Sequence, residues 1–379
     1  MHKIASFLIL KHGLHDTFYV ANMGTLRSKI SLWRQQLPSV EPFYAVKCNP
    51  DRRVLQAMVD EGMGFDCASK SEIETVLAMG CAPENIIYAH PVKKVDDLRY
   101  AVERNIRYTT FDSVSELDKL RRHAPGTSCV IRLKVDNPSA RVQLGLKYGV
   151  DRNEYRSIID AAREMDIEIA GASFHVGSAS KDPEVFAHGI DYCREVFDYA
   201  KKKGYMPRLL DIGGGFTGET FTECASVIRR GLSERFTGED GLRIIAEPGR
   251  YFAEEVFTLF TPVIGQKSRA GKNEYWLGES LYGSFNCVLY DGQVPTYEIL
   301  RNPTLPPWDG SEEAEDCVLQ MITCDSADSL GPQRLPRLRN EDYVVVKNFG
   351  AYTLSGACNF NGINLTNPPI FYIHEPPAE

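Results

Sequence analysis

The chain has 379 residues, of which 43% are apolar, 25% charged and 10% aromatic. These proportions are typical of a globular protein and exclude a disordered, collagen-like or coiled-coil chain. The formal net charge of −8 and the pI near 5.6 have the wrong sign for a protein that binds nucleic acid or an anionic membrane, so we expect neither partner.

The first forty residues predict a strand followed by a helix. The apolar run at residues 4–10 reaches Lys11 without a small-residue cleavage site, and no stretch of 18 apolar residues occurs in the chain. We therefore expect neither a signal peptide nor a membrane span. The segment TFYVAN at residues 17–22 is β-like and is followed by the helical segment LRSKISLWRQQL. We expect residues 1–40 to pack with a β domain.

Short apolar runs alternate with amphipathic segments between residues 42 and 248. Strands that alternate with helices are typical of a parallel sheet, and near-continuous apolar runs indicate strands buried on both faces. Eight such units predict an α/β fold in which residues 41–250 form a (β/α)8 barrel of the TIM type, with an open doubly wound sheet as the alternative. The runs are PFYAV, FDCA, NIIYAH, YTTFD, CVIRLKV, IEIAGASFHV, RLLDIGG and LRIIAEP.

The pattern changes after residue 250, where β-like runs are separated by connections rich in Gly, Pro and Asp. No long amphipathic helix interrupts them, so residues 251–379 predict a C-terminal all-β domain. The runs are VFTLFTPVIGQ, EYWLGE, FNCVLY, CVLQMITC, DYVVVKN and IFYIHE.

The ten cysteines are scattered along the chain without any CxxC pair. This spacing favours reduced thiols over a disulfide framework, so we expect a cytoplasmic protein. We expect no metal ion.

Polar residues follow several of the predicted barrel strands, at the face where a barrel of this kind places its functional groups. Lys47 follows the first strand, and a desolvated lysine there has the neutral amine that reacts with an aldehyde. His175 and Ser178 close the sixth strand, and the Gly213–Gly215 run after the seventh exposes backbone N–H groups suited to a phosphate. The alternatives are a surface-reaching lysine, a core histidine and a flexible turn.

Strand eight ends in AEPGRYF, which contains Glu247 and Arg250. Taken alone, this carboxylate and guanidinium could form a structural pair. Together with the preceding residues they supply what a phosphorylated pyridine aldehyde requires: an amine, a carboxylate for the ring nitrogen, an aromatic group that stacks on the ring, and donors for the phosphate.

Motifs spread over residues 42–362 resemble, in order, the fold-type III pyridoxal-phosphate-dependent basic amino acid decarboxylases, and among them the eukaryotic ornithine decarboxylases. The resemblance implies the barrel and β domain described above, decarboxylase activity and pyridoxal 5′-phosphate as cofactor. The matching segments are PFYAVKCN, GFDCASKSEIE, SFHVGSAS, LLDIGGGFTG, IIAEPGRYF, YGSFNCVLYD, TCDSAD and GAYT with FNG after it.

The resemblance also implies roles for individual residues. Lys47 is implied to hold the cofactor covalently, His175 to stack on its ring, and Glu247 to keep the pyridine nitrogen protonated. The other residues implied to bind the cofactor or to lie behind it are Asp66, Arg132, Ser178, Gly213, Gly214, Gly215, Pro248, Gly249, Arg250 and Tyr352.

The implied substrate residues lie in the C-terminal part of the chain. Cys324 matches a cysteine that reaches the site from the other subunit, and its thiol is a suitable acid for protonating Cα after CO₂ leaves. Asp291 and Asp325 would meet a distal ammonium group, which implies a diamino acid such as ornithine. Tyr290 and Phe360 match the remaining substrate positions.

Because the family's site is shared between chains, the resemblance implies a head-to-tail homodimer, with Lys147 and Asp328 as cross-subunit partners. Three departures from the family pattern stand out. Gly292 replaces a common histidine, Met321–Ile322 replaces Gly-Pro before Thr-Cys-Asp, and Gly278–Ser280 replaces Asn-Asp-Gly. The first would enlarge the pocket, and the second would alter the backbone path to Cys324.

These observations predict a decarboxylase that converts L-ornithine to putrescine and CO₂ in polyamine biosynthesis. The alternatives are a lysine or arginine decarboxylase with the same site, and a catalytically inactive regulatory homologue of the antizyme-inhibitor type. The sequence gives no information about an antizyme-like partner.

Overall fold

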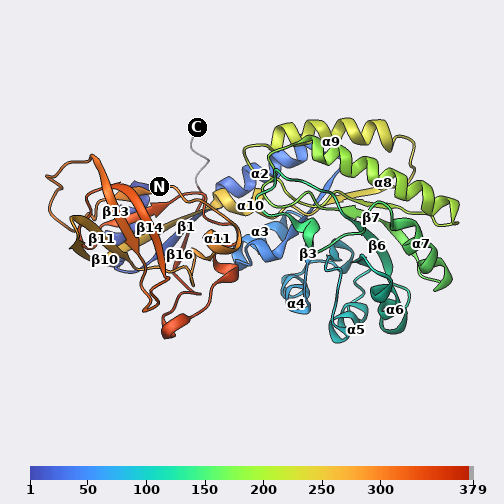
Figure 1. The fold of residues 1–379 in the computed structure, drawn as a ribbon, viewed down its shortest axis with the longest axis horizontal. Coiled ribbons are helices and arrows are strands. Elements are labelled where there is room, and N and C mark those ends of the chain that lie inside the picture. The colour runs from blue at the N-terminus through green and yellow to red at the C-terminus, as the bar shows by residue number, and fades with distance from the viewer. Residues whose placement is uncertain (375–379) are drawn as a thin grey trace. The chain divides into compact units, whose positions relative to one another are not determined.

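A computed structural model describes residues 1–374, which divide into two compact units (Figure 1). One unit comprises Lys29–Phe252. The other joins Met1–Ser28 to the segment that begins at Ala253. The chain therefore begins in the unit that contains Met1–Ser28, forms the unit Lys29–Phe252, and then returns to the unit in which it began.

The unit formed by Lys29–Phe252 contains a closed barrel of eight parallel strands, which confirms the predicted (β/α)8 fold. Each strand pairs with the next, and β2 pairs with β9 to close the ring. All eight predicted runs are strands, within a few residues at each end. They are β2 (Glu41–Ala45), β3 (Gly64–Cys67), β4 (Ile86–Tyr88), β5 (Tyr108–Phe111), β6 (Ser128–Leu133), β7 (Ile169–Phe174), β8 (Leu209–Asp211) and β9 (Arg243–Ala246).

Helices precede, connect and follow the barrel strands, and several begin at a residue that caps free backbone N–H groups. Asp51 accepts hydrogen bonds from the N–H groups of Arg53 and Val54, and Ser69 and Ser113 cap later helices in the same way. The helices are α2 (Met23–Gln36), α3 (Arg52–Asp60), α4 (Lys70–Ala78), α5 (Val95–Glu103), α6 (Val114–His123), α7 (Tyr155–Glu164), α8 (Glu184–Lys202), α9 (Phe221–Arg235) and α10 (Arg250–Ala253).

Apolar side chains from different strands pack together in the barrel unit. Phe43, Ile87, Val130, Leu209 and Ile245 come from five strands and are all buried. Because this core holds the strands in register, the residues that follow each strand are held at fixed places on the barrel mouth.

The second unit is dominated by one mixed sheet, which confirms the predicted β domain. Its strand order is β12-β15-β10-β11-β13-β14, and β1 pairs antiparallel with β10 and parallel with β16. The elements are α1 (His2–His12), β1 (Phe18–Asn22), β10 (Phe257–Arg269), β11 (Lys272–Leu277), α11 (Asn286–Tyr290), β12 (Glu298–Leu300), β13 (Ala314–Gln320), β14 (Ser329–Pro336), β15 (Tyr343–Val346) and β16 (Ile370–Ile373).

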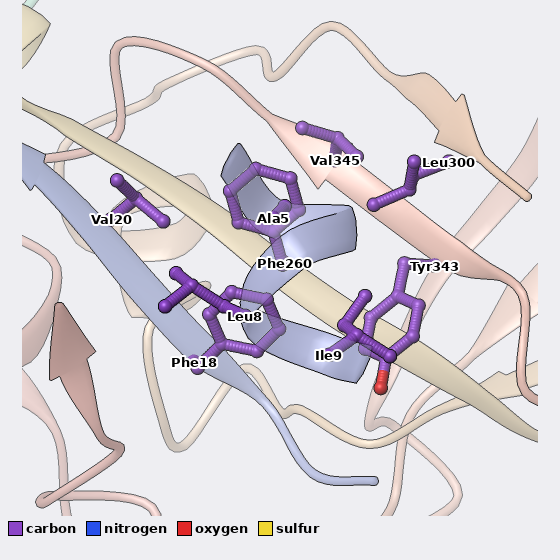
Figure 2. Close-up of a cluster of buried hydrophobic side chains, with 9 residues drawn as sticks. All are labelled: Ala5, Leu8, Ile9, Phe18, Val20, Phe260, Leu300, Tyr343 and Val345. Carbon is purple, nitrogen blue, oxygen red and sulfur yellow. The ribbon is translucent and has the colours of Figure 1, made fainter. Parts of the chain in front are cut away.

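Helix α1 lies against this sheet and buries an aromatic core (Figure 2). Leu8 and Ile9 of the helix pack with Phe18 of β1, Phe260 of β10 and Tyr343 of β15. The Phe18 and Phe260 rings stack with their centroids 5.0 Å apart. The apolar run at residues 4–10, which the sequence left without a structural assignment, thus lies in a helix that buries Ala5, Leu8 and Ile9 and leaves Phe7 and Leu10 exposed.

The expected strand FNCVLY is wrong, because the structure forms helix α11 there. Phe285 and Cys287 are buried, whereas Leu289 and Tyr290 are 61% and 78% exposed. The side chain of Asn286 donates hydrogen bonds to the carbonyls of Gly283 and Thr353, and this anchors the helical turn. Among residues 1–374, no helix has the length and apolar character needed to cross a membrane.

Candidate active site

Lys47 lies in the single turn η1 (Val46–Cys48), which follows β2 directly. Its Nζ forms an ion pair with the carboxylate of Asp66, a fully buried residue on β3 that pairs with Ala45 of β2. The Lys47 side chain is nevertheless 40% exposed, so the amine is not enclosed by its salt link. The sequence thus places an accessible amine at the mouth of the barrel, with a buried counter-ion.

Two further carboxylates are buried at the ends of neighbouring strands β8 and β9. Asp211 ends β8, and its Oδ1 accepts a hydrogen bond of 2.9 Å from the N–H of Gly213. Glu247 follows β9, and its Oε1 has no hydrogen-bond partner within residues 1–374. Burial, and then the charges of Asp211 and Asp66, raise the pKa of Glu247 well above its usual range. Glu247 is therefore suited to a cationic proton donor, such as a protonated pyridine nitrogen.

His175 follows β7 and presents a neutral ring. Its Nδ1 accepts a hydrogen bond of 3.0 Å from the N–H of Gly177, which places the proton of the neutral ring on Nε2. Burial, and then the charges of Arg132 and Lys47, lower the pKa of His175 well below its usual range. Arg132 is a nearly buried residue of β6 whose guanidinium lies 5.7 Å from the centre of the Tyr148 ring. The imidazole is thus a flat uncharged group suited to stacking.

The Gly213–Gly215 turn forms a cradle in which side chains would clash. A Cβ on Gly213 would lie 2.0 Å from the Phe174 carbonyl oxygen, and one on Gly214 would lie 2.8 Å from Nε2 of His175. Gly213 and Gly215 also have φ angles of +62° and +113°, which L-residues rarely adopt. The backbone at this turn therefore has the close approach that phosphate-binding loops require.

Arg250 and Ser178 add side-chain donors to the same unit. The Arg250 Nη2 donates a hydrogen bond of 3.1 Å to Ser178 Oγ, and Arg250 is buried. Pro248 accepts a hydrogen bond from the N–H of Ala45, and a Cβ on Gly249 would lie 2.8 Å from Cys48 Cβ, so this segment packs tightly beside the Lys47 turn.

The predicted substrate residues belong to the unit that contains the mixed sheet. Asp325 accepts a hydrogen bond of 2.5 Å from the Tyr282 hydroxyl, and the Tyr282 ring stacks on Phe360 with centroids 4.2 Å apart. Cys324, one of the two exposed cysteines, donates its backbone N–H to the side chain of Asn361 at 2.9 Å. Cys324, Asp325 and Phe360 are thus brought into one hydrogen-bonded and stacked group.

The other predicted residues of this unit are arranged differently. Tyr290 and Asp325 line one cavity of about 170 Å³, together with Cys358. Asp291 is buried and does not line that cavity. Tyr352 has a φ angle of +58°, a conformation that favours glycine, in the loop after β15.

Sequence reasoning missed two residues at these sites. Asp211 lies inside the segment LLDIGGG, in which only the glycines were predicted to bind the cofactor. A carboxylate that ends a barrel strand is itself typical of a functional residue, so this signal was present in the sequence. Tyr282 begins YGSFNCVLYD, and its contact with Asp325 links positions 43 residues apart. A single sequence carries no sign of such a pairing.

The groups of the barrel unit fit a phosphorylated pyridine aldehyde. Lys47 offers an amine and His175 a neutral flat ring, while Glu247 has an unpartnered carboxylate oxygen that can accept a hydrogen bond from a ring nitrogen. The glycine cradle and Arg250 suit a phosphate.

Comparisons with known proteins agree with this chemistry. Residues 23–254 match the family described as "Pyridoxal-dependent decarboxylase, pyridoxal binding domain". A chloroplastic ornithine decarboxylase of Nicotiana glutinosa is 41% identical over 92% of this chain and 82% of its own length. The ornithine decarboxylase of Rattus norvegicus is 38% identical over 94% of this chain and 80% of its own length.

Solved structures of decarboxylases share the whole fold. The arginine decarboxylase of Paramecium bursaria Chlorella virus, bound to agmatine, has a TM-score of 0.92 and 38% identity, with 98% of this chain and 100% of that chain covered. The lysine/ornithine decarboxylase of Vibrio vulnificus, complexed with cadaverine, has a TM-score of 0.87 and 27% identity, with 98% of each chain covered.

Proposed function

Because the chain belongs to the pyridoxal-dependent decarboxylases, and is thus a carboxy-lyase whose cofactor is pyridoxal 5′-phosphate, we propose that it converts L-ornithine to putrescine and CO₂ for polyamine biosynthesis. The observation that carries the choice of substrate is the identity of about 40% to ornithine decarboxylases over nearly the whole chain. Retention of Asp325 in the wall of a cavity supports the same choice, since a carboxylate there suits a distal ammonium group.

In this proposal the barrel residues bind and tune the cofactor. Lys47 holds it covalently, and Asp66 orients the amine. Bound cofactor supplies an electron-poor ring that accepts the electron pair released when the carboxyl group departs. Glu247 keeps a proton on the ring nitrogen, because the raised pKa of this buried carboxylate reflects its need for a cationic partner. His175 stacks as a neutral ring and so leaves the ring nitrogen's charge unopposed.

In this proposal, residues of the mixed-sheet unit act on the substrate. Asp325, and Asp291 with it, neutralise the distal ammonium, while Tyr282 fixes the orientation of the Asp325 carboxylate through its hydroxyl. The Cys324 thiol delivers a proton to Cα after CO₂ leaves, which is a task for a group whose ordinary pKa is near 8.5. Tyr290 and Phe360 supply aromatic contacts.

Two alternatives keep the same cofactor. The viral neighbour is named an arginine decarboxylase and the Vibrio neighbour a lysine/ornithine decarboxylase, so longer substrates are a specific second candidate. Gly292, where many ornithine decarboxylases have histidine, favours a roomier pocket. The other candidate is a regulatory homologue that binds cofactor without turnover.

A substrate panel tests the proposal. The protein is supplied with cofactor, and CO₂ release from L-ornithine, L-lysine and L-arginine is compared as kcat/KM. We expect ornithine to give the highest value. A higher value for lysine or arginine would replace the proposed substrate, and cofactor absorbance without CO₂ release from any of the three would favour the regulatory homologue.

The proposal includes a homodimer with shared active sites and a cytoplasmic location. Leu289 and Val294 are 61% and 87% exposed beside the substrate segment, which suits apolar contact with a second copy. The ten cysteines form no disulfide within residues 1–374, which suits a reducing compartment.

A further inference from the structure

The buried carboxylate of Asp328 gathers two loops of the mixed-sheet unit. Its side chain is 3% exposed and accepts four hydrogen bonds, two from each loop. Ser280 Oγ and the N–H of Leu281 donate at 2.9 and 2.8 Å, and they lie in the loop after β11. The N–H and the hydroxyl of Thr323 donate at 3.1 and 2.6 Å from the loop that carries Cys324.

Backbone hydrogen bonds also join the two ends of the loop that carries Cys324 and Asp325. The N–H of Asp328 donates to the Asp325 carbonyl at 3.0 Å, and the N–H of Met321 donates to the Asp328 carbonyl at 3.0 Å. Thr323 and Asp328 therefore bracket the thiol and the carboxylate on both sides. Thr323, which is hydrogen-bonded to Asp328, directly precedes Cys324 in the chain, and three residues separate Cys324 from Asp328 itself. A movement of the Asp328 side chain would therefore displace Cys324 from both sides.

Two departures from the family pattern meet at this point. Ile322 stands where proline is common, and its N–H donates to the Glu279 carbonyl at 3.1 Å, which a proline could not do. Ser280 stands where glycine is common, and its hydroxyl makes the 2.9 Å bond to Asp328. Each departure thus adds one hydrogen bond between the two loops.

We propose that Asp328 is a positioning residue, which holds Cys324 at the place from which its thiol protonates Cα and holds Asp325 against Tyr282. This inference rests on the proposed function. Three donors of the same chain meet Oδ2 of Asp328 and one meets Oδ1. The cross-subunit pairing of Asp328 with Lys147 stays a prediction.

The test compares Asp328→Asn with Asp342→Asn. Asp342 is an equally buried carboxylate of the same unit that accepts hydrogen bonds from Asn302 and Arg339, away from the Cys324 loop. In Asp328→Asn we expect hydrogen exchange at the Leu281 and Thr323 amides to accelerate by about tenfold or more, because each loses a charged acceptor. In Asp342→Asn these two amides should exchange at the wild-type rate.

Product analysis separates positioning from a merely structural role. Protonation of the substrate at Cα would yield the amine, whereas a failure of this protonation would be read out as an aldehyde and pyridoxamine phosphate. We expect Asp328→Asn to raise the aldehyde fraction several-fold and Asp342→Asn to leave it unchanged. If Asp328 acts through Cys324, Asp328→Asn should not raise that fraction further in a Cys324→Ala background. Ser280→Ala removes only one of the four bonds and should show the same changes more weakly.

The outcomes distinguish the two proposals. Unchanged exchange at both amides in Asp328→Asn and Ser280→Ala would overturn the anchoring of the loops, whatever the enzyme catalyses. Faster exchange with an unchanged product ratio, in an active enzyme, would leave Asp328 structural and overturn its positioning role. A wild type that releases no CO₂ would instead remove the proposed function, while the exchange result would still decide the anchoring.

Discussion

At the scale of single residues, the barrel mouth concentrates three buried carboxylates, Asp66, Asp211 and Glu247, around one lysine. Burial raises the pKa of Asp211 and of Glu247, and the charge of Asp66 raises both further. The places of Lys47, His175 and Glu247 at the ends of barrel strands could be predicted, because each is a polar residue directly after an apolar run. The raised pKa of Asp211 could not be predicted from the sequence, because it depends on burial and on the carboxylates that the fold brings close to Asp211.

Asp211 gives the cofactor-free protein a distinctive pH dependence. Burial raises the pKa of Asp211 to about 7, so between pH 4 and 7 the folded state binds a proton that the unfolded state has lost. This contribution to stability is complete below pH 4 and is lost as the pH rises through 7. We expect the free energy of unfolding of Asp211→Asn, relative to wild type, to increase by about 2–3 kcal/mol between pH 5 and 8. Denaturant unfolding at the two pH values measures this difference.

Asp342→Asn is the control for this measurement. Burial opposes ionisation of Asp342, but hydrogen bonds from Arg339, Asn302 and Arg301 outweigh it and lower the pKa of this carboxyl. Asp342 stays ionised from pH 5 to 8 in both states, so the cost of Asp342→Asn should be the same at both. An equally constant effect for Asp211→Asn would contradict the raised pKa.

Cys324→Ala should slow decarboxylation and divert part of the flux to the aldehyde. Removal of a general acid typically lowers the rate by about 10²–10⁴-fold. The matched control is Cys317→Ala, because Cys317 lies on β13 of the same unit and does not line the cavity that contains Asp325. We expect kcat and the product ratio to change only in Cys324→Ala. An unchanged rate and product ratio would remove Cys324 from the proposed chemistry.

At the scale of elements, the barrel strands were predictable because each is a short, nearly continuous apolar run. The structure of the FNCVLY segment was not predictable, because some of its apolar residues are buried and others are exposed. Phe285 and Cys287 enter the core, while Leu289 and Tyr290 remain exposed. Five residues are too few to distinguish strand from helix by periodicity. The side-chain contacts of Asn286 that fix the turn reach as far as Thr353, and no local pattern reveals them.

The turn after β8 is the element most sensitive to a single methyl group. In Gly214→Ala the new Cβ would lie 2.6 Å from the Glu247 carbonyl oxygen and 2.8 Å from His175 Nε2, so the cradle must open. We expect cofactor affinity to fall by about tenfold or more, as for the loss of a well-made polar contact. Titration of the cofactor-free protein by absorbance measures it.

Gly231→Ala in α9 is the matched control, because its Cβ would meet only the flexible end of Ile190 at 3.1 Å. Cofactor affinity should stay at the wild-type value there, and the helix should gain about 0.5–1 kcal/mol of stability. Equal affinity in Gly214→Ala and wild type would show that the cofactor does not use this turn.

At the scale of the whole molecule, the assignment of residues to units separates the proposed cofactor residues, except Tyr352, from the proposed substrate residues. Lys47 belongs to the unit Lys29–Phe252, and Cys324 belongs to the unit built from both chain ends. The sequence could predict two domains from the change in pattern near residue 250. It could not predict where one chain's Cys324 acts, because that depends on assembly.

Shared sites predict that two inactive variants restore activity together. Lys47→Ala and Cys324→Ala each spoil every site of their own homodimer. After dissociation, mixing in equal amounts and reassociation, half of the dimers are mixed, and each mixed dimer has one site with both residues intact. We expect about a quarter of wild-type activity. A mixture no more active than its components would contradict sites shared between subunits.

Strand β1 lies between β10 and β16, although some 235 residues separate it from β10 and some 350 from β16. The pairing of β1 with these two strands therefore closes long loops, which costs conformational entropy. During synthesis on the ribosome, the whole barrel segment is made before β10 and β16, the two strands that pair with β1. The nascent amino-terminal segment, with the apolar face of α1 and the edge of β1 uncovered, is therefore the part of this polypeptide most in need of a chaperone before translation ends.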